Sequence, residues 1–210
     1  MDIVQLRARL RRDLRDEDPD DQRWSDAELD RHLQRALREL SLSAPLEAVV
    51  SLTAPGGGRD LSLADLDGLV AVEAVEHPVG LFPPAYVPFS LWGNVLTLMG
   101  ERVPAAGDQV RVYYTRLHIL DETGSTLPPP LEDLLLTGAA AYAALEWAGY
   151  AANRVNVGGE DVWRRYLAWG ERMLGLFHEG LERHSRRRAV QARRLYVPAH
   201  GPSLRRRQEG

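Results

Sequence analysis

Histidine is the side chain in this sequence best suited to metal binding or to proton transfer near neutral pH. The six histidines are scattered, and no two have the i, i+4 spacing that places a zinc pair on one helix face: His32, His77, His118, His178, His184 and His200. No HExxH motif is present, and the absence of cysteine excludes disulfides and thiolate chemistry. The sequence therefore predicts no metal site and no cofactor.

Other segments that resemble catalytic or phosphate-binding motifs lack the flanking residues that such motifs require. Residues 56–58 are three glycines, but Arg59 and Asp60 follow them, which favours a turn over a phosphate-binding loop. The adjacent acids at 132–133 and 160–161 stand at expected helix starts, where they complement the helix dipole and point apart. The acidic run 16–21 lacks the glycine and final glutamate of an EF-hand and predicts a solvated turn. No catalytic residue is predicted, and the chain is expected not to be an enzyme.

Charge is distributed unevenly along the chain. The net charge is −4 and all 26 basic residues are arginine, a weak indication of a thermophilic host. Residues 183–207 hold nine arginines and no acid, so the rest of the chain is strongly acidic. A basic arm of this kind contacts an anionic partner or lies solvated. Because no aromatics alternate with the arginines, contact by charge is favoured over base readout, and the free arm is expected to be disordered after about His184.

The sequence predicts four helices, which would position the histidines, acids and arginines described above. Residues 2–16 have apolar side chains at helical spacing, and Ser25 to Glu28 form a capping box for a second helix that ends before Pro45. A central helix is predicted for residues 128–152, with prolines in its first turn and mostly small residues after Leu136. A fourth helix starts near Glu160 and carries a wide apolar face.

The central helix also has the length of a membrane span, with Glu146 as the one charge in residues 134–152. Alanine is barely apolar, however, and large apolar residues are sparse after Leu136, so a core helix is the stronger interpretation. Small residues on most faces of a helix allow neighbours to approach closely. We therefore expect this helix to be buried against other helices and against other copies of the chain.

Residues 46–120 have a different character. Strands are predicted at 49–53, 69–75, 94–99 and 109–117, with turns rich in proline and glycine between them. A proline-rich loop at 81–89 offers Phe82, Tyr86 and Phe89 to a partner or to a local core. This segment is predicted to be an antiparallel β module inserted between helices, packing as a semi-independent unit.

The expected fold is mainly α: a four-helix body with an inserted small antiparallel β module and an extended basic C-terminal tail. Residues 1–45 hold the N-terminal helices and 46–120 the β module. Residues 121–188 hold the central and fourth helices, and 189–210 form the extended arm.

The order of these elements resembles the head–tail connector (adaptor) proteins of long-tailed bacteriophages. The resemblance is carried by residues 24–29 (WSDAEL), 110–118 (VRVYYTRLH), 126–128 (TLP) and 134–143 (LLLTGAAAYA). It covers nearly the whole chain in order. The β module is larger than the minimal family pattern, which leaves open whether it faces the tail or the ring exterior.

The resemblance implies a structural virion protein in the neck, between capsid and tail, that is assembled in the host cytoplasm. Copies of the chain would form a ring, commonly of about twelve, that docks under the portal and continues the DNA channel to a tail-side neck or tail protein. DNA would pass without sequence readout, and no membrane would be involved. The alternative is a nucleic-acid-binding accessory protein that acts through the arginine arm; a hydrolase of unknown type is a weaker third option.

Two sets of residues are expected to make these contacts. Subunit packing is assigned to aromatic residues of the fourth helix that span more than one face: Trp163, Tyr166, Trp169 and Phe177. Portal contact, rather than DNA contact, is assigned to the arm: Arg186, Arg187, Arg188, Arg193, Arg194, Leu195, Tyr196, Val197, Arg205, Arg206 and Arg207.

Overall fold

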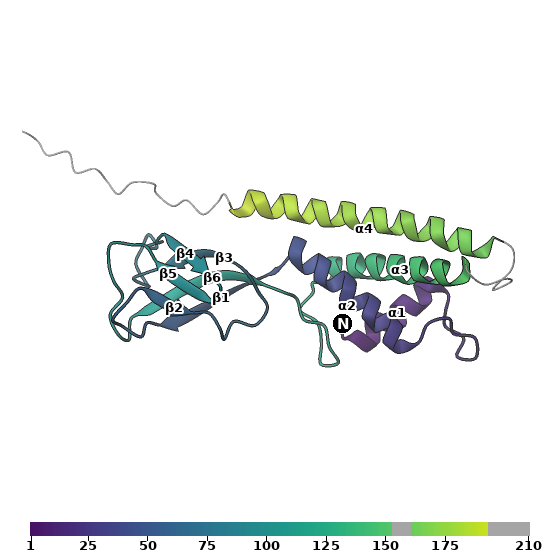
Figure 1. The fold of residues 1–210 in the computed structure, drawn as a ribbon, viewed down its shortest axis with the longest axis horizontal. Helices are drawn as coiled ribbons and strands as arrows, with labels where there is room; N and C mark the ends of the chain where they lie inside the picture. Colours follow the sequence, from purple (N-terminus) through teal and green to yellow (C-terminus); the bar gives the residue numbers. More distant parts are fainter. Residues whose placement is uncertain (153–160, 193–210) are drawn as a thin grey trace, which may run out of the picture.

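The computed structural model describes residues 1–152 and 161–192, with side chains through residue 186. Its four helices are α1 (Ile3–Leu14), α2 (Asp26–Ser43), α3 (Pro129–Ala152) and α4 (Val162–Ala192). They form an elongated helical body at one end of the molecule, and the strands form a separate module at the other end (Figure 1). Helix α4 lies along α3, while α1 and α2 pack on the other side of α3.

The N-terminal helices begin where side chains can satisfy their free N–H groups. Asp2 caps α1, and the predicted capping box of Ser25 and Glu28 caps α2. Residues 17–21 of the connection between them are exposed, as the predicted solvated turn requires, but Asp16 is only 2% exposed. Its carboxylate accepts hydrogen bonds from Arg11 Nη1 at 2.6 Å and from the backbone N–H of Arg23 at 2.6 Å. A buried carboxylate is tolerated here because it is paired and hydrogen-bonded.

Small residues allow α4 to lie close to α3. A Cβ atom added to Gly138 of α3 would come within 2.8 Å of the Phe177 ring, and one added to Gly180 of α4 would come within 2.4 Å of Leu134. Alanines 139, 140, 141, 143 and 144 are all buried. The prediction of a buried central helix is confirmed, and no helix in the described ranges is long and apolar enough to cross a membrane.

The module consists of two three-stranded antiparallel sheets. The first has the order β1-β6-β3, with β1 (Leu46–Thr53), β6 (Gln109–Arg116) and β3 (Leu69–Glu76). The second has the order β2-β5-β4, with β2 (Asp60–Ser62), β5 (Val95–Leu98) and β4 (Phe89–Trp92). Their apolar faces enclose a separate core that includes Leu61, Val75, Leu96, Leu98 and Val112. The short strands β2 and β4 were not predicted.

A buried histidine joins the two parts. His118 follows β6, and its Nε2 lies 2.9 Å from the carbonyl oxygen of Ala44, just after α2. Its Nδ1 lies 3.0 Å from Thr126 Oγ1, and its backbone N–H donates to Ser41 Oγ at 3.1 Å. Burial lowers the pKa of His118, so the neutral ring serves as a fixed link between body and module.

Two predictions about the fold need correction. Helix α4 continues to Ala192, so residues 189–192 are helical rather than part of an extended arm. The remaining residues of the predicted arm lie outside the described residues. Because the module contains two sheets with their own core, the chain is described better as a helical body plus a β module than as mainly α.

Candidate subunit interface

A long groove runs along the side of the body where α4 passes over α3 and α1. It consists of three adjoining hollows of about 660, 290 and 350 Å³. Trp169 lines the first two hollows, while Met173 and Thr137 line the first and third. The shared residues make these hollows one continuous surface, which we call the α3–α4 groove.

The groove has an apolar floor and an arginine-rich rim. The floor is formed by side chains of α3 and α4: Leu134, Leu136, Trp169, Met173 and Leu176. Arginines 9, 12 and 15 from α1 and its C-terminal cap stand along one wall, and Arg165 and Arg183 come from α4. Arg9 is paired with Asp133 at 2.8 Å. Such a surface combines apolar area with charges that could select the orientation of a partner.

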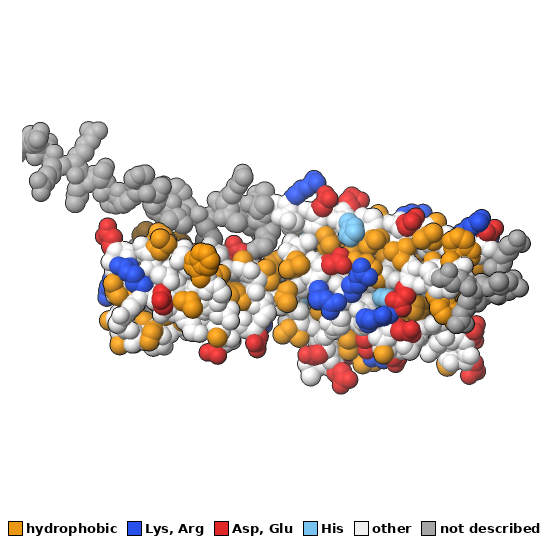
Figure 2. Space-filling model, viewed as in Figure 1, with side chains coloured by type: hydrophobic (Ala, Val, Ile, Leu, Met, Phe, Trp, Pro, Cys, Tyr) orange, Lys and Arg blue, Asp and Glu red, His pale blue; other side chains and the backbone are white. Residues whose placement is uncertain are grey.

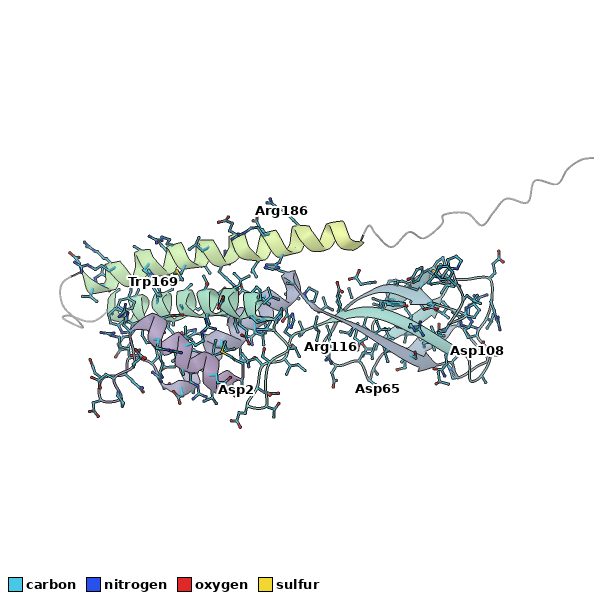
Figure 3. The ribbon with its side chains drawn as sticks, turned by 180° about the vertical axis from the view of Figure 1, so that it is seen from behind. Asp2, Asp65, Asp108, Arg116, Trp169 and Arg186 are labelled. Carbon is cyan, nitrogen blue, oxygen red and sulfur yellow. The ribbon has the colours of Figure 1, made fainter. Side chains whose placement is uncertain are left out.

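Among the sequence-predicted packing residues, Trp169 contributes most to this groove, since it lines two of the hollows, whereas Tyr166 lines one of them. Met173 lies four residues later, on the same face of α4, and Tyr166 lies three residues earlier. Figure 3 shows Trp169 on the side of α4 that faces the rest of the body. Its side chain is only half-buried, so apolar ring surface remains available to a neighbour.

Trp163 and Tyr166 are divided between the chain's own core and its surface. The ring of Tyr166 lies 4.4 Å from that of Trp147, centroid to centroid, and its hydroxyl accepts a hydrogen bond from Arg23 Nη1 at 3.1 Å. Tyr166 also lines the hollow beside Trp169. Trp163 is half-buried against the core, with the Arg164 guanidinium 5.2 Å from its ring centroid. Both residues therefore build the body first and offer only part of their surface outward.

The assignment of Phe177 to subunit packing is wrong. Its side chain is 0% exposed and lies over Gly138, edge-on to Tyr142 at 6.3 Å between centroids. The helical spacing correctly identified an apolar face, but spacing alone does not say which part of a wide face the chain's own α3 covers. Phe177 is a core residue of the body.

The arm residues are mostly beyond the described part. Arg186 is exposed on α4 and pairs with Glu182 at 2.9 Å (Figure 3). Residues 187 and 188 lie in α4, and their side chains are outside the described set, as are residues 193–207. Portal contact by this arm stays a prediction.

The three aromatic residues of the loop at 81–89 differ in burial: two pack within the module and one is exposed. Tyr86 packs edge-on against Tyr113 at 6.0 Å, and Phe89 begins β4 at the margin of the module core. Phe82, in contrast, is 98% exposed. Trp92, at the tip of the β4–β5 hairpin, is also largely exposed and was not singled out from the sequence. Figure 2 shows apolar side chains on both parts of the surface.

Acidic side chains in the body form ion pairs with nearby basic groups. Glu132 is buried and bonds to the amino group of Met1, while its neighbour Asp133 turns to Arg9. Burial raises the pKa of Asp13 in the groove wall, partly opposed by Arg9 and Arg12. In the described ranges, no three histidine or acidic side chains gather as metal ligands do. The arrangement is suited to binding another protein surface.

The groove was only partly visible from the sequence. Trp169 was found from its apolar spacing, but the wall formed by α1 was missed because three separate helices meet there. The arginines at 9, 12 and 15 recur at three-residue intervals, which places them near one another on α1 and is the signal that could have indicated a shared face.

The sequence model of the SU10 adaptor protein family matches residues 1–196. Among solved structures, a chain from the neck of an empty GTA particle, computed with C6 symmetry, is 18% identical, with a TM-score of 0.31 and coverage of 82% of this chain and 88% of that chain. A chain from the neck of a native GTA particle, computed with C12 symmetry, is 17% identical, with a TM-score of 0.29 and coverage of 81% and 86%. No curated protein sequence matches the chain.

Proposed function

This chain belongs to the SU10 adaptor protein family, and we propose that it is a structural head-to-tail adaptor whose copies form a ring in the neck of a virion. The ring docks under the portal and continues the DNA channel toward a tail-side protein. Function then resides in surfaces that join copies and partners.

The observation that carries this proposal is the α3–α4 groove. A ring is closed by heterologous contacts, in which one surface of each copy meets a different surface of the next. The apolar floor around Trp169 and Met173 is open to such a neighbour, whereas the alanines in the middle of α3 are buried within the chain. We assign the groove as the receiving side of the subunit contact.

The charge distribution supports the channel and portal roles. Outside residues 183–207 the chain carries 17 arginines and 30 acidic residues. An acidic ring repels the DNA backbone, so DNA passes without being held. The basic end of the chain is assigned to the portal.

Substitution of Trp169 by aspartate tests the groove. A carboxylate in an apolar contact loses its hydration without gaining a partner, so the Trp169→Asp chain should remain monomeric where the parent forms rings on portal. Ala168→Asp adds the same charge at the adjacent, exposed position of α4 and is expected to assemble. Thermal melting by circular dichroism verifies that both variants are folded. Rings of normal mass from folded Trp169→Asp protein would overturn the assignment.

The arginine-rich end separates this function from the alternative of a nucleic-acid-binding accessory protein. Deletion of residues 194–210 should abolish docking to purified portal in the absence of DNA. DNA binding through arginines alone would be independent of sequence and would weaken steeply as salt increases. Unchanged portal docking by the truncated chain, together with DNA binding by the arm at physiological salt, would favour the accessory role.

A further inference from the structure

Sheet edges are potential binding sites, because their backbone N–H and C=O groups can pair with another strand. Three of the four edges in the β module are protected. The β3 edge has two register irregularities and is covered by residues 85–87, where Val87 N–H donates to Val75 O at 2.9 Å. Strands β2 and β4 have only three and four residues. Bulges, coverage and shortness are the devices by which proteins block edge pairing.

Strand β1 has none of these protections. It runs for eight residues in unbroken register with β6, from Leu46 opposite Arg116 to Thr53 opposite Gln109, and contains no proline. Ala54 N–H donates to Asp108 O at 2.8 Å, which places the even-numbered residues of β1 in bonds to β6. The backbone groups of Glu47, Val49 and Ser51 then point to the open side. Within residues 1–152 and 161–192, no backbone hydrogen bond reaches that side.

The side chains of β1 indicate what kind of strand would fit. On one face, Ala48, Val50 and Leu52 pack at the margin of the module core and remain partly exposed, so an added strand with apolar residues would extend that core. On the other face, Val49 is 57% exposed and Glu47 supplies a negative charge. The module as a whole has eight acidic residues and four arginines between 46 and 120. A short basic strand with alternating apolar residues matches both faces.

We propose that residues 193–197 of a second copy of this chain add to β1 as a fourth strand. This segment reads Arg-Arg-Leu-Tyr-Val and is followed by Pro198, which would end the strand. Leu195 and Val197 would lie on the core face beside Val50, and Arg194 and Tyr196 on the face of Glu47 and Val49. Residues 193–210 carry five arginines and one glutamate, opposite in sign to the module.

The occupant comes from a second copy because of where α4 ends. In Figure 1, α4 ends above the β module, and β1 is the edge of its sheet farther from that end. The segment begins directly after Ala192 and would have to cross the sheet to reach its own β1. A neighbour supplies it without this reversal, as in arm exchange between identical subunits. The inference rests on the proposed ring to bring the second copy alongside. It gives residues 193–197, which were assigned to the portal from the sequence alone, to the neighbouring copy and leaves residues 205–207 for the portal.

Disulfide cross-linking tests this arm exchange in full-length protein, since the natural chain contains no cysteine. Val49→Cys and Tyr196→Cys chains are mixed on portal, oxidised and separated by size. Paired strands bring opposite Cβ atoms to about 4.5–5.5 Å, within or close to the range that a disulfide bridges. A dimer containing one chain of each kind is expected. Leu195→Cys, on the opposite face of the added strand, should give roughly tenfold less of this dimer.

A proline at the open edge provides the control for the backbone. Ser51→Pro in the Val49→Cys chain removes an outward N–H and spares the bonds to β6, so the cross-link should fall roughly tenfold, which corresponds to about 1.4 kcal/mol. Sedimentation of the same samples reports rings. If rings form but the cross-link does not, arm exchange is overturned and the ring is kept. If the cross-link forms without rings, edge pairing is supported and the ring is overturned. If neither forms, both proposals are overturned. Equal cross-linking at 195 and 196 would also overturn strand pairing.

Discussion

The helical body and the β module hold their shape by different means. In the body, glycine and alanine allow α4 to lie close to α3, and large side chains such as Phe177 fill the space left by a missing Cβ. In the module, a buried carboxylate holds a loop to the sheet. Glu76 is 2% exposed and accepts hydrogen bonds from the N–H of Gly80, the hydroxyl of Tyr113 and Arg111 Nη1, each at 3.0 Å.

The surfaces that the body and the module expose to partners also differ in kind. The body presents an apolar groove, whose binding depends on side-chain shape, whereas the module presents a bare backbone edge, whose binding depends on strand direction and on face. An assembly built from both can join neighbours firmly through the groove and tie them together through an exchanged strand. The following substitutions test whether the two parts differ as described.

The largest effect is expected in the body, from Phe177→Ala. Truncation of a fully buried phenylalanine should lower the free energy of unfolding by about 3–5 kcal/mol, because the ring fills the space over Gly138. Phe82→Ala is the matched control in the module, where the ring is exposed, and should change stability by less than about 0.5 kcal/mol. Urea denaturation measures both. A larger loss from Phe82 than from Phe177 would reverse the comparison.

Glu76→Gln should weaken the module by about 1–3 kcal/mol, since Arg111 and the Gly80 N–H lose a charged acceptor. The Gly80 N–H, with Tyr113 and Arg111, holds the pKa of Glu76 below its usual 4.5. The carboxylate therefore contributes stability above that pH and loses it as the pH falls through the lower folded-state pKa. The variant should have a flatter stability profile below pH 4.5. An unchanged acid profile would mean that Glu76 does not act as a charged anchor.

A pH effect in a different range is expected from two buried histidines. Burial lowers the pKa of His118, at the junction, and of His32, in the body, below the usual 6.5. The unfolded chain then binds more protons, so stability is complete above pH 6.5 and declines as the pH falls toward the folded-state values. Replacement of both by glutamine should remove this decline between pH 7 and 5 in urea titrations. Persistence of the decline would place its source elsewhere.

The smallest effect is expected on α4. Gly175 is exposed, and a Cβ there would meet nothing within 4 Å, so Gly175→Ala should stabilise the chain by about 0.4–1 kcal/mol. Gly138→Ala in α3 should destabilise it, because the new methyl group would collide with the fully buried ring of Phe177. Thermal melting of the pair measures both signs. The same sign for both substitutions would show that close packing of α3 and α4 is unimportant.

The sequence predicted the body better than the module for a physical reason. Helices have local signals, such as the Ser25 capping box and the apolar spacing of α2, so their existence and most of their bounds follow from neighbouring residues. Strand β2 has three residues and β4 adjoins a proline-rich loop, so neither has enough alternation to be recognised. Asp16 is buried because Arg11 pairs with it across a turn. The high density of acidic residues around Asp16 had predicted that its side chain would be exposed to solvent.

The candidate interface was predicted in part. Trp169 was identified because apolar spacing marks a wide face, but the same rule included Phe177, which α3 covers. The groove wall and the bare β1 edge both depend on which elements become neighbours in space. No local pattern contains that information.

Electron cryomicroscopy of the chain bound to its portal would show which surfaces join neighbouring copies. We expect a closed ring in which each subunit boundary buries the α3–α4 groove, with Trp169 and Met173 covered by the next copy. A ring whose boundaries leave this groove open to solvent, or a complex that contains single copies, would contradict it.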